Sequence, residues 1–396
     1  NIFLLLKMNV FNINNYILLN KIENSSFSEL YTARDKNTGE VLAAKISLIS
    51  FDESNPSIKK LSNYMGDTKQ LNHPAILKYI GYCSNNFYNE PKPVIISQFM
   101  PNRSLEEVLY KRKNLSTLSH WNDTLKFINI FGIASAMSHL HSHNIIHGYL
   151  YPNNILLNYH IFPKVSDFQP FNLHGSTQNT IDTKTVIYTA PELCGNSNYS
   201  KEGDVYAFGM IMYEILTNEK PFKNLNFFEV LTKVATGNRP SISSSITDSY
   251  SKLIQKCWSQ NPTDRPTFDD IVKMLRNDSL FMTDSTDRQE CENYIEYIDE
   301  YQIIYEKTGK RLSFEDFVPS RLKMFAPASY ASEDQIQNNE KNQTKQAETE
   351  TQNISSGQFD FTIKNNQNKT EDSTLKNYDF DLTNKASKNE TQNNSN

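Results

Sequence analysis

A single lysine interrupts an otherwise apolar run early in the chain. The segment Val41–Ile46 reads Val-Leu-Ala-Ala-Lys-Ile, and Lys45 is its only charged residue. Such a lysine is either an edge residue of a sheet, whose ammonium lies in water, or part of a site in which a fixed cation holds an anionic ligand. The run by itself leaves both explanations open, so residues elsewhere in the chain have to decide between them.

Residues that bind metals or form disulfides show no grouping. No Cys-x-x-Cys pair or Cys/His cluster occurs, and the four cysteines are far apart: Cys83, Cys194, Cys257 and Cys291. This spacing favours reduced thiols and gives no reason to expect a zinc site. We therefore expect a cytoplasmic protein.

Charge and hydropathy argue against further classes of function. Lysine and arginine total 40 against 45 acidic residues, which gives a net charge of −5, so the overall charge does not favour nucleic acid or an anionic membrane. The apolar run Ile2–Leu6 is far shorter than the roughly 20 residues that a membrane-spanning helix needs. We expect a protein partner, no nucleic acid and no membrane span.

The elements around Lys45 have the pattern of strands. Two strand-like segments precede the lysine-bearing run, Tyr16–Leu19 and Ser28–Ala33. The turn-forming segment Asn37–Glu40 lies between Ser28–Ala33 and the lysine-bearing run. Two apolar runs on either side of a turn predict a hairpin. The first part of the chain is therefore expected to form a small antiparallel sheet.

Helical periodicity dominates the part of the chain that follows. Between Ile130 and Leu140, apolar residues recur at the three- and four-residue spacing of one helix face. The segment Asp204–Leu216 is too apolar for a surface helix and predicts a buried one.

Composition changes several times along the chain. The residues after the main domain are first acidic and tyrosine-rich, and then so rich in Asn, Gln, Lys and Thr that they cannot offset the entropy of ordering. The expected regions are an N-terminal extension at 1–15, a domain at 16–280 with lobes at about 16–98 and 103–280, an acidic helical extension at 281–328 and a disordered tail at 329–396.

Short motifs within the main domain occur in the order found in protein kinases. Each is weak alone, but their shared order makes the resemblance specific. The chain resembles the protein kinase superfamily, and its hinge and Cys-Trp…Arg-Pro segments resemble the tyrosine-kinase-like group. The motifs are Lys45, Asn72-His73-Pro74, Val94–Leu105, His147–Asn154, Ser166–Gln169, Ala190-Pro191-Glu192, Asp204-Val205-Tyr206 and Cys257–Pro266.

The resemblance implies an α+β, bilobal, protein-kinase-like fold. Its N-lobe would be a small antiparallel β-sheet plus one helix, and its C-lobe would be larger and mainly helical. By resemblance, Glu192 and Arg265 form a buried ion pair and Asp204 holds the backbone of the catalytic loop. Lys45 would then hold the α- and β-phosphates of ATP instead of lying at a sheet edge.

The phosphate end of the implied nucleotide site departs from the family pattern. Glycines there would let the backbone approach the phosphates. All three are replaced, by Glu23, Ser25 and Ser28. The glutamate that should pair with Lys45 is replaced by Tyr64, and Asp67, one turn further on, is either a substitute partner or a solvated residue.

The catalytic loop departs furthest from the family. Against the pattern His-Arg-Asp-Leu-Lys-Pro-x-Asn, the chain has Gly148 for the arginine, Tyr149 for the catalytic aspartate and Tyr151 for the lysine. A phenol has a pKa near ~10, so Tyr149 should be protonated at pH 7 and unable to accept the substrate proton. Losing a general base typically costs ~10²–10⁴ in rate. This loop predicts a pseudokinase.

Other parts of the site match the family. Asn154 and Asp167 match the two Mg²⁺ ligands, with retention as polar packing residues as the alternative, while Gln169 replaces the glycine after Asp-Phe. ATP and Mg²⁺ are the cofactors that the resemblance implies. The implied adenine-pocket residues are Leu30, Ala43, Met100 and Leu156, with Ser97 at the gatekeeper position.

The segment between Asp167 and Glu192 carries four threonines that could be phosphorylated. They are Thr177, Thr180, Thr183 and Thr185. In the family, the arginine before the catalytic aspartate binds such a phosphate, and Gly148 removes that arginine. We expect that phosphorylation here does not switch activity in the usual way.

A further helix is expected after the main domain. Its apolar stripe has helical spacing and ends near Gly309. The stripe packs on the helical lobe or binds a partner. Its residues are Cys291, Tyr294, Ile295, Ile298, Tyr301 and Tyr305.

Three functions are compatible with these residues. The leading hypothesis is a pseudokinase that scaffolds or allosterically regulates a signalling partner. The alternative is a weakly active Ser/Thr protein kinase that transfers the γ-phosphate of ATP to protein hydroxyls. The third is a binding protein that responds to nucleotide without turning it over.

Overall fold

The computed structural model describes residues 11–25, 27–50, 61, 64–66, 68, 71–111, 121–168, 185–194, 198–309 and 313–317. The chain divides into two units, 1–330 and 331–396, and every described residue lies in the first. Several sequence predictions fall outside the described residues: those on 1–10, Asp67, Gln169, Thr177, Thr180, Thr183 and the tail 329–396.

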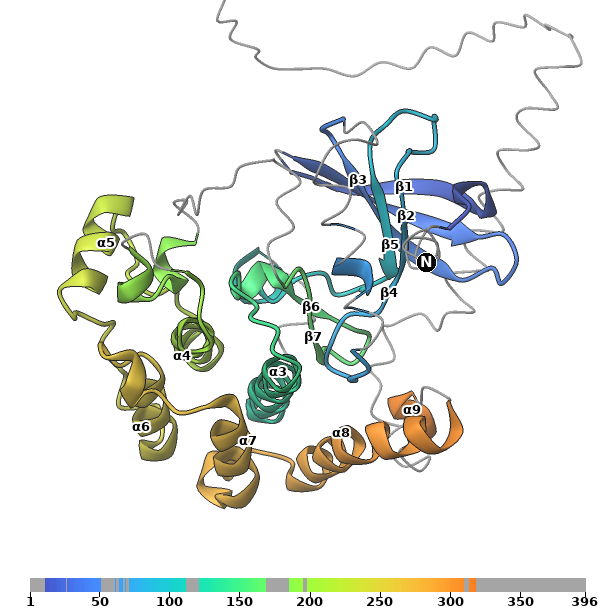
Figure 1. The fold of residues 1–396 in the computed structure, drawn as a ribbon. Coiled ribbons are helices and arrows are strands. Elements are labelled where there is room, and N and C mark those ends of the chain that lie inside the picture. Colours follow the sequence, from blue (N-terminus) through green and yellow to red (C-terminus); the bar gives the residue numbers. More distant parts are fainter. Residues whose placement is uncertain are drawn as a thin grey trace, which may run out of the picture. The chain divides into compact units, whose positions relative to one another are not determined.

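The first lobe is built on a five-stranded antiparallel sheet in the order β1-β2-β3-β5-β4 (Figure 1). Alternate residues of one central strand, Leu42, Ala44 and Ile46, face a small apolar core together with Ile96. The strands are β1 (Tyr16–Asn24), β2 (Ser28–Asp35), β3 (Val41–Ser47), β4 (Tyr79–Cys83) and β5 (Val94–Gln98).

The position of Lys45 in this sheet decides between its two explanations. Lys45 lies opposite Leu30 on β2 and opposite Ile95 on β5, so the lysine-bearing strand is paired on both sides. Lys45 is not at a sheet edge. Because side chains alternate along a strand, Lys45 points to the face opposite Leu42, Ala44 and Ile46.

A helical segment accompanies the sheet. Leu61, Tyr64, Met65 and Thr68 are helical and buried, at the i, i+3, i+4 and i+7 spacing of one helix face. The first lobe therefore has the sheet-plus-helix content that the sequence predicts.

The second lobe is helical and is centred on α3 (Asp123–Ser142). This helix packs against α4 (Lys201–Thr217), α7 (Phe268–Asn277) and α8 (Arg288–Thr308) (Figure 1). Its apolar stripe is buried, but so are residues on its other faces, so α3 is a core helix of the lobe. The other helices are α5 (Phe227–Ala235), α6 (Asp248–Cys257) and α9 (Phe314–Phe317). None of the helices in the described part of the chain is long and apolar enough to cross a membrane.

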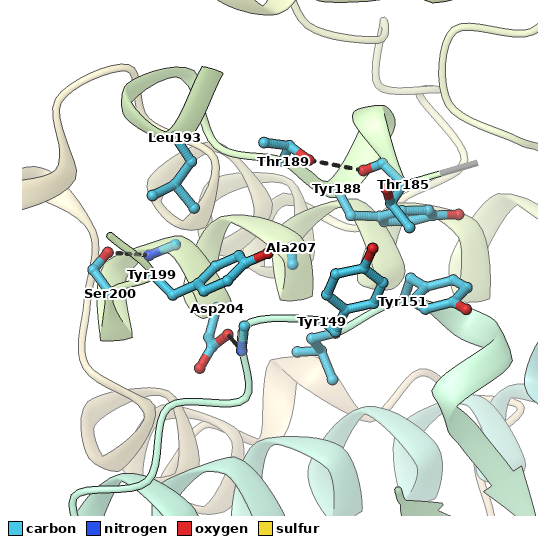
Figure 2. Close-up of a pocket in the computed structure, with 13 residues that line it drawn as sticks. Tyr149, Tyr151, Thr185, Tyr188, Thr189, Leu193, Tyr199, Ser200, Asp204 and Ala207 are labelled. Carbon is cyan, nitrogen blue, oxygen red and sulfur yellow. Dashed lines mark hydrogen bonds between the residues drawn. The ribbon is translucent and has the colours of Figure 1, made fainter. Parts of the chain in front are cut away.

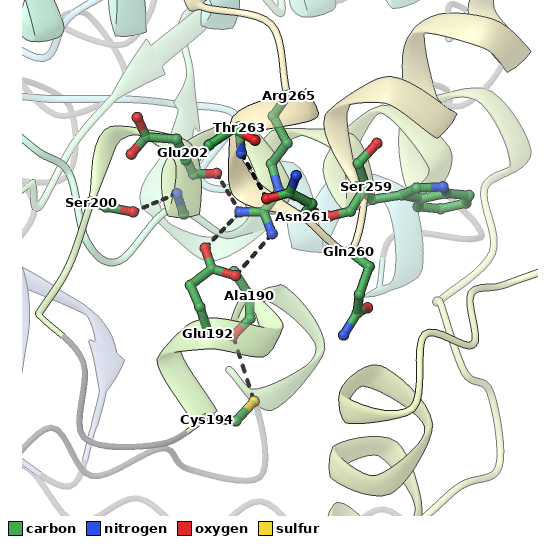
Figure 3. Close-up of polar contacts among 12 residues, drawn as sticks. Ala190, Glu192, Cys194, Ser200, Glu202, Ser259, Gln260, Asn261, Thr263 and Arg265 are labelled. Atoms are coloured by element: carbon green, nitrogen blue, oxygen red, sulfur yellow. Dashed lines mark hydrogen bonds and ion pairs between the residues drawn. The ribbon is translucent and has the colours of Figure 1, made fainter.

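An ion pair ties distant segments of this lobe together (Figure 3). The two terminal nitrogens of Arg265 donate to the two carboxylate oxygens of Glu192 at 2.6 and 2.8 Å. The Arg265 side chain is fully buried and also donates to the carbonyl oxygens of Glu202 and Ser259. The bonds to Glu192 and Glu202 join segments more than 60 residues apart, so the pair is part of the lobe's architecture.

The C-terminal helix α8 begins at Arg288 and ends at Thr308, followed by Gly309 in the left-handed conformation at φ +66°. Four residues of the predicted stripe are buried, namely Cys291, Tyr294, Ile298 and Tyr301, while Ile295 and Tyr305 are partly exposed. The helix therefore packs on the helical lobe, which was the first of the two expectations for it.

Candidate functional site

One carboxylate fixes the backbone of the catalytic loop. Asp204, in the first turn of α4, accepts hydrogen bonds from the backbone amides of His147 and Gly148, both at 2.8 Å. The Nε2 of His141 lies 2.9 Å from the same side chain. Asp204 is only 3% exposed, so these bonds are shielded from water and fix the loop backbone.

The loop then presents two tyrosines, Tyr149 and Tyr151, where the resemblance implies charged residues. The amide of Tyr149 donates to Nδ1 of His147 at 3.2 Å, and its carbonyl oxygen accepts from the Asn154 amide nitrogen at 2.8 Å. The rings of Tyr149 and Tyr151 are 6.1 Å apart in an edge arrangement. Burial lowers the pKa of His147, which keeps this ring neutral and able to accept.

Lys45 has an ion-pair partner across the two lobes. Its ammonium lies 2.9 Å from a carboxylate oxygen of Asp167, a residue 122 positions later in the sequence. Asp167 has a left-handed backbone at φ +54°, and its amide donates to the hydroxyl oxygen of Tyr79. The strained backbone is held by these contacts, which aim the carboxylate at the lysine.

Tyr64 stands where the resemblance implies a glutamate, and its ring packs against two other aromatic rings. It lies 5.4 Å from the ring of Phe168 and 5.6 Å from that of Tyr79. Burial raises the pKa of the Tyr64 hydroxyl, so it cannot replace a carboxylate. Among the described residues, Lys45 therefore has Asp167 as its ion-pair partner and no other.

The turn between β1 and β2 is closed by a serine hydroxyl. The Oγ of Ser25 accepts from the amides of Phe27 and Ser28, at 3.3 and 2.9 Å, and donates to the Ser28 carbonyl oxygen at 2.9 Å. These amides belong to the loop that would cover phosphates in the implied site. A phosphate oxygen would have to displace Ser25 to bond with them.

The implied adenine-pocket residues come from four segments. Ala43 on β3 lies opposite Ser97 on β5, and Leu30 is on β2. Met100 follows β5 and is buried, while Leu156 lies on the short strand β6 (Ile155–Leu157), which pairs with β7 (Pro163–Val165). Glu23 is at the end of β1, opposite Leu30. The pocket itself stays a prediction.

Several residues of the site were not found from the sequence. Tyr79 bonds to Asp167, Tyr188 lies beside Tyr151 at 6.1 Å, and Tyr199 lies against Gly148. The sequence could have indicated Tyr188, because it lies two residues before the Ala190-Pro191-Glu192 motif. For Tyr79 and Tyr199 no motif gave one, because their roles arise from contacts between distant segments.

The prediction that Thr185 could be phosphorylated is not supported by its burial. The sequence offers it as a phosphorylation site, but it is 9% exposed, and its carbonyl oxygen accepts from the Thr189 hydroxyl at 3.0 Å. A residue this buried is a poor substrate for another kinase in this conformation.

A two-lobed fold with a strand lysine, a loop carboxylate opposite it and an aspartate-held catalytic loop defines a protein kinase domain. The protein tyrosine and serine/threonine kinase family matches residues 17–275, and the chain belongs to this family.

Curated relatives carry serine/threonine kinase names. The chain is 29% identical over 273 residues to a probable serine/threonine-protein kinase, drkC, of Dictyostelium discoideum, covering 66% of this chain and 35% of the relative. It is 33% identical over 213 residues to a probable LIM domain-containing serine/threonine-protein kinase of the same organism, covering 53% and 31%. It is 32% identical over 213 residues to a putative serine/threonine-protein kinase/receptor of Acanthamoeba polyphaga mimivirus, covering 53% and 13%. The match thus spans about a third or less of each relative.

Proposed function

We propose that this chain is a pseudokinase that acts by binding and regulating or scaffolding a signalling protein. The observation that carries the proposal is the phenol of Tyr149 at the position of the catalytic base. Phosphoryl transfer to a hydroxyl needs a carboxylate there to orient that hydroxyl and take its proton. A neutral ring alcohol provides neither a negative charge nor a free acceptor of comparable basicity.

The surrounding residues support the same proposal. Tyr151 replaces a lysine that would stabilise the transferring phosphoryl group, and Tyr64 replaces the glutamate that would orient Lys45. The lost groups are charged and their replacements are aromatic. Restoring one charge would therefore leave the other two functions unfilled.

The residues present fit Mg²⁺-ATP in part. Lys45 would hold phosphate oxygens, and Asn154 and Asp167 offer oxygen atoms of the kind that Mg²⁺ prefers. Against this, Ser25 already occupies two amides of the phosphate-covering turn. When bound, Mg²⁺-ATP would supply the transferable γ-phosphoryl group. We propose ATP as a ligand that favours the folded state rather than as a substrate.

An assay for protein phosphorylation tests the proposal. Purified protein is incubated with labelled ATP, Mg²⁺ or Mn²⁺ and generic protein substrates, beside the Lys45→Ala variant. We expect no incorporation above the level of that variant. Incorporation that disappears in Lys45→Ala would show that the chain itself transfers phosphate and would end the proposal.

A second candidate is a weakly active Ser/Thr kinase. The pair of Lys45 and Asp167 at 2.9 Å favours it, because an inert domain has no need to keep these charges together. In that case Tyr149→Asp should raise the rate by about 10²-fold or more. A rate unchanged by this substitution argues against the candidate.

The sequence-based boundaries are proposed unchanged. They give a kinase domain at 16–280, a helical extension at 281–328 and a tail at 329–396. The cytoplasm is the proposed compartment, on the basis of four cysteines that are all free among the described residues.

A further inference from the structure

A pocket opens beside the catalytic loop, on the side of α4 (Figure 2). It is partly open to solvent, and its cavity volume is about 50 Å³. Four tyrosines from three segments of the chain line it: Tyr149, Tyr151, Tyr188 and Tyr199. The same residues that remove kinase chemistry from the loop therefore form a wall of this pocket.

Gly148 makes room for one of the four rings. Its backbone is left-handed at φ +71°, and a Cβ added there would lie 3.1 Å from the ring of Tyr199. Any other residue would be strained by its conformation and crowded by the ring. The position of Tyr199 therefore depends on Gly148, which stands where the resemblance implies an arginine.

The rings form a connected aromatic wall. Tyr149 and Tyr151 lie 6.1 Å apart at an interplanar angle of 73°, and Tyr151 and Tyr188 lie 6.1 Å apart at 39°. Figure 2 shows Tyr199 on the other side of Tyr149. Burial raises the pKa of Tyr199, so its ring remains a neutral phenol. Neutral aromatic faces carry a partial negative charge that attracts cations.

Two acidic side chains lie near the pocket, and Glu214 is protonated at neutral pH because burial raises its pKa to about 8. Asp204 lines the pocket, and Glu214 receives hydrogen bonds from the Tyr188 hydroxyl at 2.9 and 3.0 Å. None of the described lining residues is a lysine or an arginine. An anionic ligand such as a phosphate would meet no positive partner among these lining residues, whereas a cation would meet the aromatic rings.

The hydrogen-bonding capacity of the lining is largely committed. The two oxygens of Asp204 bind the loop amides and His141, the Thr189 hydroxyl donates to Thr185, and the Ser200 hydroxyl accepts from Gly203. An unmodified ammonium has three donors that need acceptors. A trimethylated, quaternary ammonium keeps the charge without those donors, so it suits such a lining better.

We propose that this tyrosine-lined pocket binds a methylated alkylammonium cation, through cation–π contacts with Tyr149, Tyr151, Tyr188 and Tyr199. The cation is either the head of a methylated lysine side chain or a free quaternary ammonium compound, since both present the same chemistry. The site goes beyond the proposed scaffolding function and does not depend on whether phosphate transfer occurs.

The test compares a cation with a neutral molecule of the same shape. Choline and 3,3-dimethylbutan-1-ol are titrated into the full chain at constant ionic strength, and binding is followed by calorimetry and by NMR. We expect choline to bind about 10-fold more tightly, equal to about 1.4 kcal/mol. Equal affinities, or no saturable binding of choline up to tens of millimolar, would overturn the proposal.

Variants locate the binding in the pocket. Tyr149→Phe and Tyr199→Phe keep the rings and should retain the preference for choline, while Tyr149→Leu and Tyr199→Leu should lose it. Tyr88→Leu is the matched control, because Tyr88 is 76% exposed and does not line the pocket. A preference that survives in the two leucine variants would contradict the assignment, and the phenylalanine variants guard against a folding defect.

Peptides separate the two sources of the cation. A short peptide with a trimethylated lysine is compared with the same peptide carrying unmodified lysine or neutral norleucine. Binding of the trimethylated peptide at least as tight as that of choline supports a protein side chain, and binding of choline alone supports a small molecule. Phosphorylation assays run in parallel report on the proposed function separately.

Discussion

The buried carboxyl group of Glu214 should make the stability of this domain depend on pH. It lies inside α4, fully buried, and receives hydrogen bonds from Tyr188 at 2.9 and 3.0 Å and from Tyr110 at 2.6 Å. Burial raises its pKa from 4.5 to about 8, because the charged form loses its hydration, although the two phenols partly offset this. The perturbation we consider is Glu214→Gln.

The sign of the effect follows from the raised pKa. Between pH 4.5 and 8 the folded state binds a proton that the unfolded state has released. The stabilisation from the protonated form is therefore complete below pH 4.5 and is lost as the pH rises through 8. The difference of 8 minus 4.5, or 3.5 pKa units, corresponds to about 5 kcal/mol at most.

Urea unfolding at constant ionic strength, from pH 5 to pH 8.5, measures the effect. Glutamine keeps the shape and an acceptor for the phenols but cannot ionise, so Glu214→Gln should flatten the profile and exceed the parent protein in stability at pH 8.5. Glu219→Gln is the control, since Glu219 is an exposed acid just beyond the same helix. If the free energy of unfolding depends on pH equally in the parent protein and in Glu214→Gln, the reasoning is refuted.

Two further predictions concern the nucleotide turn and the architecture of the C-lobe. Ser25→Gly frees the amides of Phe27 and Ser28, so calorimetry should show ATP binding roughly fivefold more tightly, equal to about 1 kcal/mol. The control Ser25→Thr keeps the hydroxyl and should leave the ATP affinity unchanged. An equal gain in both variants would contradict the role of the hydroxyl. Glu192→Gln leaves the guanidinium of Arg265 buried without a counter-charge, so urea unfolding should show a loss of about 3 kcal/mol, the lower end of the range because the Glu192 side chain is 24% exposed. A loss below about 1 kcal/mol would mean that water replaces the carboxylate there.

Much of the fold follows from local sequence patterns. The strands around Lys45, the buried helix at Asp204–Leu216 and the helix ending near Gly309 could be predicted because hydrophobic periodicity and turn residues act over a few positions. The setting of Lys45 could not be predicted from its own segment. Its strand is central because β5, some 50 residues later, pairs with it, and sequence periodicity carries no record of such partners.

The site divides in the same way. From the order of motifs, the sequence predicts that Tyr149 and Tyr151 stand where the resemblance to kinases implies charged residues. It does not show that Tyr199 lies on Gly148, or that Tyr110 and Tyr188 meet at Glu214, because the residues in each contact are separated by tens of positions.

The sequence by itself determined which chemical groups this domain has, among them Lys45, Asn154, Asp167 and the phenol of Tyr149, at positions where the resemblance predicts a site. Side-chain identity fixes charge and proton affinity to first order, whatever the fold. Only the tertiary structure decided how those groups are used. Burial and contact set the partner of Lys45, the raised pKa of Glu214 and the gathering of four tyrosines around one pocket, because desolvation and packing depend on neighbours that the chain brings together from a distance.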